Sequence, residues 1–127
     1  MIKELIDLQR NSKATCTIIE TSEYKLLKPA ISIKASVSDK FLFAGEKPAF
    51  ADKLNEKCGK TSLCYFVITE IDEISLEKQE RFIGLVKDRE INGYTLPDNC
   101  VIVFTVKDKV ALKNLSKDLY HFAVVAF

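Results

Sequence analysis

Two short apolar segments with a stretch of helical spacing between them constrain this chain more than any other feature. The segments are 63–68 (LCYFVI) and 100–106 (CVIVFTV), and the apolar residues of 76–90 recur at the spacing of one helix face. Apolar runs of this length are typical of strands buried on both faces of a parallel sheet. The sequence therefore predicts a parallel strand–helix–strand unit, with a hairpin-like turn at 91–99.

The remaining segments extend this unit into an α/β domain. Further strands are expected at 14–19 (ATCTII), 41–43 (FLF) and 121–127 (HFAVVAF). The segment 25–36 fits either a helix with Pro29 in its first turn or, by the alternation of ISIKASV, a strand, and we favour the helix. The other expected helices cover the ranges 1–9, 47–58 and 107–117, with Gly59 in the left-handed conformation that ends a helix. Strands that alternate with helices predict a three-layer αβα domain around a mostly parallel five-stranded sheet.

Size and charge narrow the function classes. A chain of 127 residues is long enough for one domain, 1–127, with one core. The formal net charge is only +1, and the basic residues are dispersed, so we expect no nucleic-acid partner. No apolar run approaches the ~20 residues that span a bilayer. The charged, amphipathic start of the chain does not resemble a signal peptide, so we expect no membrane association and a cytoplasmic location.

The four cysteines give no sign of a metal site in the sequence. They form no Cys-x-x-Cys pair, and His121 is the only histidine. Three of them (Cys16, Cys64, Cys100) fall inside predicted strands, where a free thiol acts as a small apolar side chain. We therefore expect reduced core cysteines, with only Cys58 exposed, and no bound metal.

One long segment carries a resemblance to a known family. Residues 65–106 (YFVITEIDEISLEKQERFIGLVKDREINGYTLPDNCVIVFTV) resemble the Walker B to sensor-1 region of an AAA+ ATPase of the MoxR-like kind. The most specific local match is the turn 92–99 (NGYTLPDN), and the segments 50–58 and 115–127 also resemble family elements. The resemblance implies a P-loop NTPase core with strand order 5-1-4-3-2 and 14–19 near the centre of the sheet.

The resemblance also indicates where the catalytic acids would lie. In the family an apolar strand ends in Asp-Glu, where the first acid holds Mg²⁺ and the second orients the attacking water. Glu70 matches the second acid, and Asp72 follows it. Thr69 stands in place of the first acid, and a neutral hydroxyl is a poor ligand for Mg²⁺. These residues are thus a vestigial Walker B motif, unless Glu70 is simply a solvated acid at a strand end.

The phosphate-binding loop of such ATPases is not recognisable. The one Gly-Lys-Thr sequence, 59–61, lacks the earlier glycine and precedes a strand instead of opening a helix. After the strand 14–19, where the loop belongs, the segment 20–28 (ETSEYKLLK) holds two acids and no glycine, although Lys25 or Lys28 stands near the position of the missing lysine. The sensor-1 position falls at Lys107 and the arginine-finger position at His121. We expect no lid domain after Phe127.

These features lead to two functional hypotheses. The first is a non-catalytic, AAA+-like pseudo-ATPase domain that acts as an interaction or regulatory module, through a protein partner or self-association, with no cofactor. The alternative is a residual nucleotide binder that holds ATP and Mg²⁺ at the carboxyl edge of the sheet, in a crevice lined by Thr69, Glu70, Lys107 and either Lys25 or Lys28. A remnant with no present role is a third reading.

Overall fold

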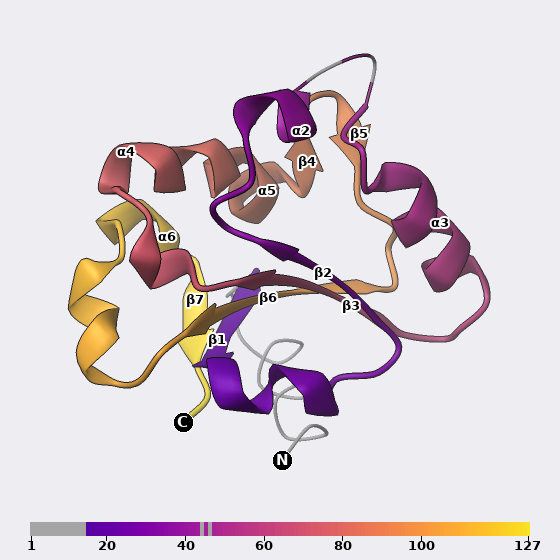
Figure 1. The fold of residues 1–127 in the computed structure, drawn as a ribbon. Helices are drawn as coiled ribbons and strands as arrows, with labels where there is room; N and C mark the ends of the chain where they lie inside the picture. Colours follow the sequence, from indigo (N-terminus) through magenta and orange to yellow (C-terminus); the bar gives the residue numbers. More distant parts are fainter. Residues whose placement is uncertain (1–14, 44, 46) are drawn as a thin grey trace.

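A parallel sheet forms the middle of the domain in the computed structural model, which describes residues 15–43, 45 and 47–127. Its five strands lie in the order β2-β3-β6-β1-β7, and every neighbouring pair is parallel (Figure 1). The strands are β1 (Cys16–Glu20), β2 (Ala30–Lys34), β3 (Cys64–Thr69), β6 (Cys100–Val106) and β7 (Ala123–Val125). Numbered one to five along the chain, this is the expected order 5-1-4-3-2, with β1 between β6 and β7.

The predicted central unit is confirmed. Every residue of β3 and β6 is buried, which explains why both segments read as nearly continuous apolar runs. The two strands are direct neighbours, with Phe66 beside Ile102. The hairpin-like turn is confirmed as well, because β4 (Glu90–Ile91) pairs antiparallel with β5 (Tyr94–Thr95).

The helices are shorter than expected and lie mainly on one face of the sheet. They are α2 (Asp39–Phe43), α3 (Ala51–Gly59), α4 (Leu76–Gln79), α5 (Ile83–Asp88) and α6 (Lys117–His121), with 3₁₀ helices η1 (Thr21–Leu26), η2 (Ile71–Glu73), η3 (Glu80–Phe82) and η4 (Val110–Asn114). In Figure 1, α2 to α5 lie above the sheet and η1, in purple, lies below it.

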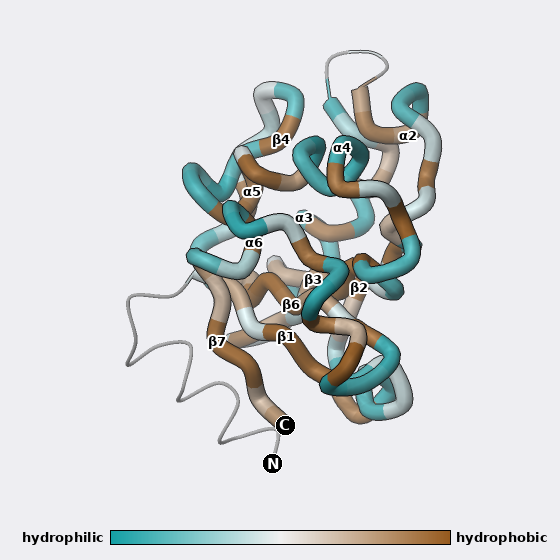
Figure 2. Tube along the Cα trace, turned by 90° about the vertical axis from the view of Figure 1, so that its left-hand side faces the viewer, coloured by the Kyte–Doolittle hydropathy of each residue, from teal (hydrophilic) through white to brown (hydrophobic). Residues whose placement is uncertain are grey.

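The alternation of each strand divides the buried residues into two clusters. On the helical face, Phe66 and Phe104 pack with residues such as Leu54 of α3 and Leu85 of α5. On the opposite face a smaller cluster joins Tyr65, Val67, Val101, Val103, Ile19 and Leu27. Tyr24 of η1 packs against this smaller cluster. Figure 2 shows the strands as the apolar centre of the trace, with hydrophilic segments outside them.

The second strand of the sheet is not the one that the sequence analysis favoured. Residues 41–43 belong to α2, in which Leu42 is buried and the side-chain oxygen of Ser38 accepts a hydrogen bond from the Phe41 amide at 3.3 Å. Such a hydroxyl before the first turn favours a helix over a strand. The strand is instead β2, within the ambiguous segment 25–36. Because β2 lies at the edge of the sheet, its burial alternates, which is the pattern of ISIKASV.

Several helix boundaries also differ from those expected. The segment 76–90 is not one helix but the series α4, η3 and α5, although Ser75 caps its start by accepting a hydrogen bond from the Lys78 amide. The segment 107–117 contains η4 and the start of α6. Gly59 is the last residue of α3 and does not adopt the left-handed conformation, so that prediction was wrong. The helix expected at 1–9 lies outside the described residues.

Candidate functional site

The carboxyl edge of the sheet is the place to look for a site, because ligands of open parallel sheets bind outside the carboxyl ends of the strands. Three consecutive strands of the sheet end there: β3 at Thr69, β6 at Val106 and β1 at Glu20. The segments that follow these strands are η1, η2 and the turn before η4. The site residues predicted from the sequence lie in or beside these segments.

A chain of hydroxyl groups links the ends of these three strands. The Oγ1 atoms of Thr21 and Thr105 are 2.9 Å apart and share a hydrogen bond. The Thr105 Oγ1 also accepts a hydrogen bond from the backbone amide of Glu70 at 3.0 Å. Thr105 is fully buried. It lies on the face of the sheet that η1 covers, because it is two residues from Val103 and four from Val101, which belong to the cluster on that face. The beginnings of η1 and η2 are thus joined directly through one side chain of β6.

Glu70 is held at this edge in an unusual backbone conformation. Its φ and ψ are 61° and 41°, which is the left-handed region. A residue with a Cβ atom pays about 1–2 kcal/mol for this conformation, so the surrounding structure must enforce it. The bond from its amide to Thr105 and the bond from the Glu73 amide to its carbonyl at 3.1 Å do so. The side chain of Glu70 is partly exposed.

Thr69 and Asp72, which the resemblance groups with Glu70, differ in their surroundings. Thr69 is buried, and its hydroxyl donates a hydrogen bond to the Ile33 carbonyl of β2 at 3.4 Å, so it faces the neighbouring strand. Asp72 lies in η2, and its buried Oδ1 atom has no hydrogen-bond partner among the described residues. A buried acceptor without a partner is rare, so the Oδ1 atom of Asp72 is an unusual feature of this edge.

The lysines of the alternative hypothesis follow β1 and β6 in the chain. Lys25 and Lys28 line a cavity of about 440 Å³ together with Lys57 of α3 and residues at the start of β2. Neither Thr69 nor Glu70 lines this cavity, and Lys107 does not either. Lys107 directly follows β6 and is exposed. A crevice that joins Glu70 to Lys25 or Lys28 therefore stays a prediction of that hypothesis.

The segment after β1, where the resemblance would place a phosphate-binding loop, is η1. This 3₁₀ helix begins directly after β1, contains no glycine and carries Glu23 in its first turn. Phosphate cradles need backbone N–H groups that converge on an anion, usually with glycines that permit the approach. The Gly-Lys-Thr sequence 59–61 lies at the end of α3, where Lys60 pairs with Glu56 at 3.0 Å. His121 ends α6 with its side chain exposed.

Sequence reasoning missed two groups of residues. It did not single out Thr21 and Thr105, although each is a hydroxyl residue beside the end of an apolar strand. It was also wrong about Cys58, which is buried, and about the thiol of Cys64, which forms a disulfide with Cys58, although Cys16, Cys64 and Cys100 do lie in buried strands as expected. The remaining thiols of the described residues, Cys16 and Cys100, are free and buried. Burial raises the pKa of each to about 12, so both are protonated thiols at neutral pH.

Comparison with known proteins adds no identification. No model of a known protein family and no curated protein matches this chain. Within the described part of the chain, no helix combines the length and the apolar character needed to cross a membrane. The functional argument therefore rests on the sequence resemblance and on the geometry of the carboxyl edge.

Proposed function

We propose that this chain is a non-catalytic, AAA+-like domain, a pseudo-ATPase core that acts as an interaction or regulatory module in the cytoplasm. The observation that carries the proposal is the closure of the carboxyl edge after β1. There the glycine-free helix η1 stands in place of a phosphate-binding loop, and its Thr21 is bonded to Thr105 of β6. A nucleotide would meet side-chain hydroxyls and the acids Glu20 and Glu23 instead of a cradle of free amides.

Two features of the fold support the relation to AAA+ cores. The sheet order is the one that the resemblance implies. The Asn-Gly-containing turn 92–99 begins in the hairpin β4–β5 and leads into β6, which is its place in the family pattern. Sheet order alone is shared by many proteins of different function, so the functional part of the proposal rests on the site.

The interaction role follows from what such a domain retains once nucleotide binding is lost. The scaffold and its surfaces remain, so the domain would act through a protein partner or a second copy of itself. Self-association is tested by sedimentation velocity over a range of protein concentrations, in which a concentration-dependent change of mass indicates a homo-oligomer. A mass that stays monomeric directs the search to a different protein partner.

One observation favours the alternative of residual nucleotide binding. Glu70 is held in a strained conformation at a strand end, and Asp72 beside it has a buried oxygen without a partner. Strained residues cluster at functional sites. Under this alternative, Mg²⁺ and the phosphates of ATP would lie at the carboxyl edge near Glu70, with Thr69, Asp72, Lys107 and either Lys25 or Lys28 around them.

Calorimetric titration with ATP, with and without Mg²⁺, separates the two hypotheses. The titration is carried out on the unmodified chain, on Glu70→Gln and on Glu73→Gln as a matched control, and phosphate release is measured in parallel. We expect neither binding heat nor phosphate release in any of the three proteins. Mg²⁺-dependent binding that becomes tighter in Glu70→Gln, but not in Glu73→Gln, would overturn the proposal in favour of an ATPase.

A further inference from the structure

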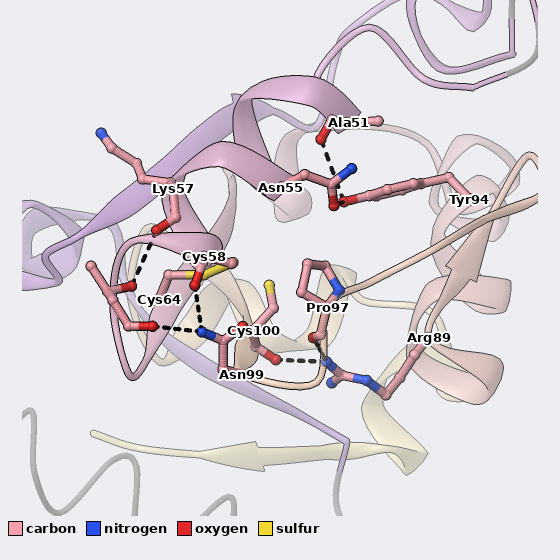
Figure 3. Close-up of a disulfide and its surroundings, with 11 residues drawn as sticks. Ala51, Asn55, Lys57, Cys58, Cys64, Arg89, Tyr94, Pro97, Asn99 and Cys100 are labelled. Carbon is pink, nitrogen blue, oxygen red and sulfur yellow. Dashed lines mark hydrogen bonds between the residues drawn. A yellow bond between two sulfur atoms is a disulfide. The ribbon is translucent and has the colours of Figure 1, made fainter.

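Three cysteines that are distant in the sequence meet at the opposite edge of the sheet. The Sγ atoms of Cys58, Cys64 and Cys100 all lie within 4.8 Å of one another, and all three residues are buried. Cys58 belongs to the last turn of α3, whereas Cys64 and Cys100 are the first residues of β3 and β6. Figure 3 shows the three side chains converging between the end of α3 and the two strands.

Backbone pairing and side-chain hydrogen bonds hold together the segments that carry these three cysteines. Cys64 and Cys100 are register partners in adjacent strands, so their side chains leave the same face of the sheet. The side-chain amide of Asn99 donates to the Cys58 carbonyl at 2.7 Å and to the Thr61 carbonyl at 2.9 Å. These bonds hold the turn after α3 against the start of β6 (Figure 3). The cluster is therefore preorganised by elements of the fold and not by a loose loop.

A cation stands beside the cluster. The guanidinium group of Arg89 donates from Nη2 to the carbonyl oxygens of Pro97 and Cys100, each at 2.8 Å. Three thiolates around a divalent ion carry a net charge of −1, which the charge of Arg89 offsets. Buried charges are tolerated when they are compensated in this way. Among the described residues, no histidine or carboxylate belongs to the cluster.

When the disulfide of this buried cluster is reduced, its three cysteines can act as thiolate ligands for a thiophilic metal ion. Cysteine sulfur selects Zn²⁺ and other soft ions over Mg²⁺ or Ca²⁺, and three protein ligands suffice for zinc when a non-protein ligand takes the fourth position. We propose that the reduced protein binds one Zn²⁺ ion through Cys58, Cys64 and Cys100. This site is independent of the carboxyl edge and of the function proposed for it.

The disulfide between Cys58 and Cys64 is the oxidised alternative to this site. A dithiol reductant opens it by exchange: the S–S bond of Cys58–Cys64 breaks, the reductant becomes a disulfide, and two protein thiols form. Binding of Zn²⁺ then displaces the three thiol protons. In the oxidised protein only Cys100 of these three cysteines keeps a thiol, so the site is absent. Metal binding and the disulfide are thus mutually exclusive states of the same three residues.

Metal titration of the full chain tests this inference without any substitution. Co²⁺, a spectroscopic substitute for Zn²⁺, is added to fully reduced protein and to protein with Cys58–Cys64 oxidised, and Zn²⁺ is then used to displace it. We expect a sulfur-to-cobalt charge-transfer band that saturates at one ion per chain, only in the reduced protein, and that Zn²⁺ abolishes. No band in the reduced protein, or equal bands in both states, would overturn the proposal.

Alanine variants assign the ligands. Cys58→Ala and Cys100→Ala should each weaken Zn²⁺ binding by more than ~100-fold, beyond what loss of an outer-shell partner costs. Cys16→Ala is the matched control, since Cys16 is also a buried free cysteine but lies outside the cluster, and it should bind as the unmodified chain does. Circular dichroism checks that each variant is folded. Full affinity in folded Cys100→Ala would contradict the three-sulfur site.

Discussion

At the scale of single residues, Thr105 links the segments that follow the two strands next to β6 at the carboxyl edge. Its hydroxyl is bonded both to Thr21, which follows β1, and to the amide of Glu70, which follows β3. The family pattern would place the sensor-1 residue at Lys107, but Lys107 lies beyond the end of β6 and is exposed. The polar residue that faces the ends of the neighbouring strands is Thr105 instead.

Replacing Thr105 by Val tests the importance of this hydroxyl. The shape of the side chain is retained, but the Glu70 amide and the Thr21 hydroxyl lose their shared partner. We expect Thr105→Val to lower the free energy of unfolding by roughly 1–3 kcal/mol, the usual cost of unsatisfied buried polar groups. Urea denaturation measures the change. Thr95→Val, at an exposed strand position, is the control and should change stability by no more than about 0.5 kcal/mol; equal effects of the two substitutions would contradict this role.

Cys16 makes the stability depend on pH in the alkaline range. Burial raises the pKa of its thiol from 9.0 to about 12, so the unfolded chain loses this proton at a lower pH than the folded chain. The stabilisation is fully present below about pH 9 and is lost as the pH rises toward 12. The advantage in unfolding free energy of the unmodified chain over Cys16→Ala should therefore shrink by roughly 1 kcal/mol between about pH 9 and pH 10. Because the comparison cancels other titrating groups, an advantage that is independent of pH would show that the thiol is accessible to solvent.

The sequence predicted residue roles that depend on near neighbours and missed those that depend on distant ones. The apolar spacing of 76–90, for example, indicated helical structure that is present in α4 and α5. The burial of Cys58 depends on its disulfide with Cys64 and on Asn99, which is 41 residues away and bonds to its carbonyl. No spacing in the sequence shows that contact. The same limit hid the pair Thr21 and Thr105.

At the scale of elements, the sequence predicted helix or strand correctly where the pattern of apolar residues fits only one of the two. β3 and β6 are buried on both faces, and their apolar runs identified them. β2 is an edge strand that follows Pro29, so its alternating pattern competed with a helical interpretation, and the helix was wrongly favoured. The three apolar residues 41–43 were read as a strand because the signal that favours the helix, the capping bond from Phe41 to Ser38, depends on local geometry.

Gln79 explains why the segment 76–90 is not one continuous helix. Its fully buried side chain donates to the Asn114 carbonyl at 2.8 Å and accepts from the Ser116 amide at 2.6 Å, and so joins α4 to the segment between η4 and α6. Arg81 does the same toward β2, with its Nη2 atom 2.7 Å from the Ala35 carbonyl. The chain changes from α4 to η3 between these two anchored residues.

Replacing Gln79 by Leu should loosen this junction. The buried Ser116 amide would lose its acceptor and the Asn114 carbonyl its donor, so we expect a loss of roughly 2–3 kcal/mol in the free energy of unfolding. Lys78→Leu is the control, because Lys78 precedes Gln79 on the same helix and is exposed. Chemical denaturation of both variants measures the difference. If Gln79→Leu is as stable as the control, the apolar packing around α4 and not the hydrogen bonds holds the junction.

At the scale of the whole molecule, the sheet has the strand order that the resemblance implies, and η1 lies directly after β1 at its carboxyl edge. The order of the strands in the sheet could be expected only from the family resemblance. The periodicity of apolar residues predicts where strands lie in the sequence, but it does not predict which strands are neighbours. The absence of glycine after β1 could be read directly from the sequence. The way in which that position is filled, by η1 with Thr21 bonded to Thr105, required the structure.

The most direct measurement is a two-dimensional amide NMR spectrum of the chain during titration with Mg²⁺-ATP to millimolar concentration. A bound nucleotide at the carboxyl edge would contact η1 and the segment around Glu70, so the amides of Thr21, Glu70 and Thr105 report on it. The account predicts that these signals stay in place throughout the titration. A concerted, saturable shift of the three signals that requires Mg²⁺ would contradict it and show that the edge opens to hold a nucleotide.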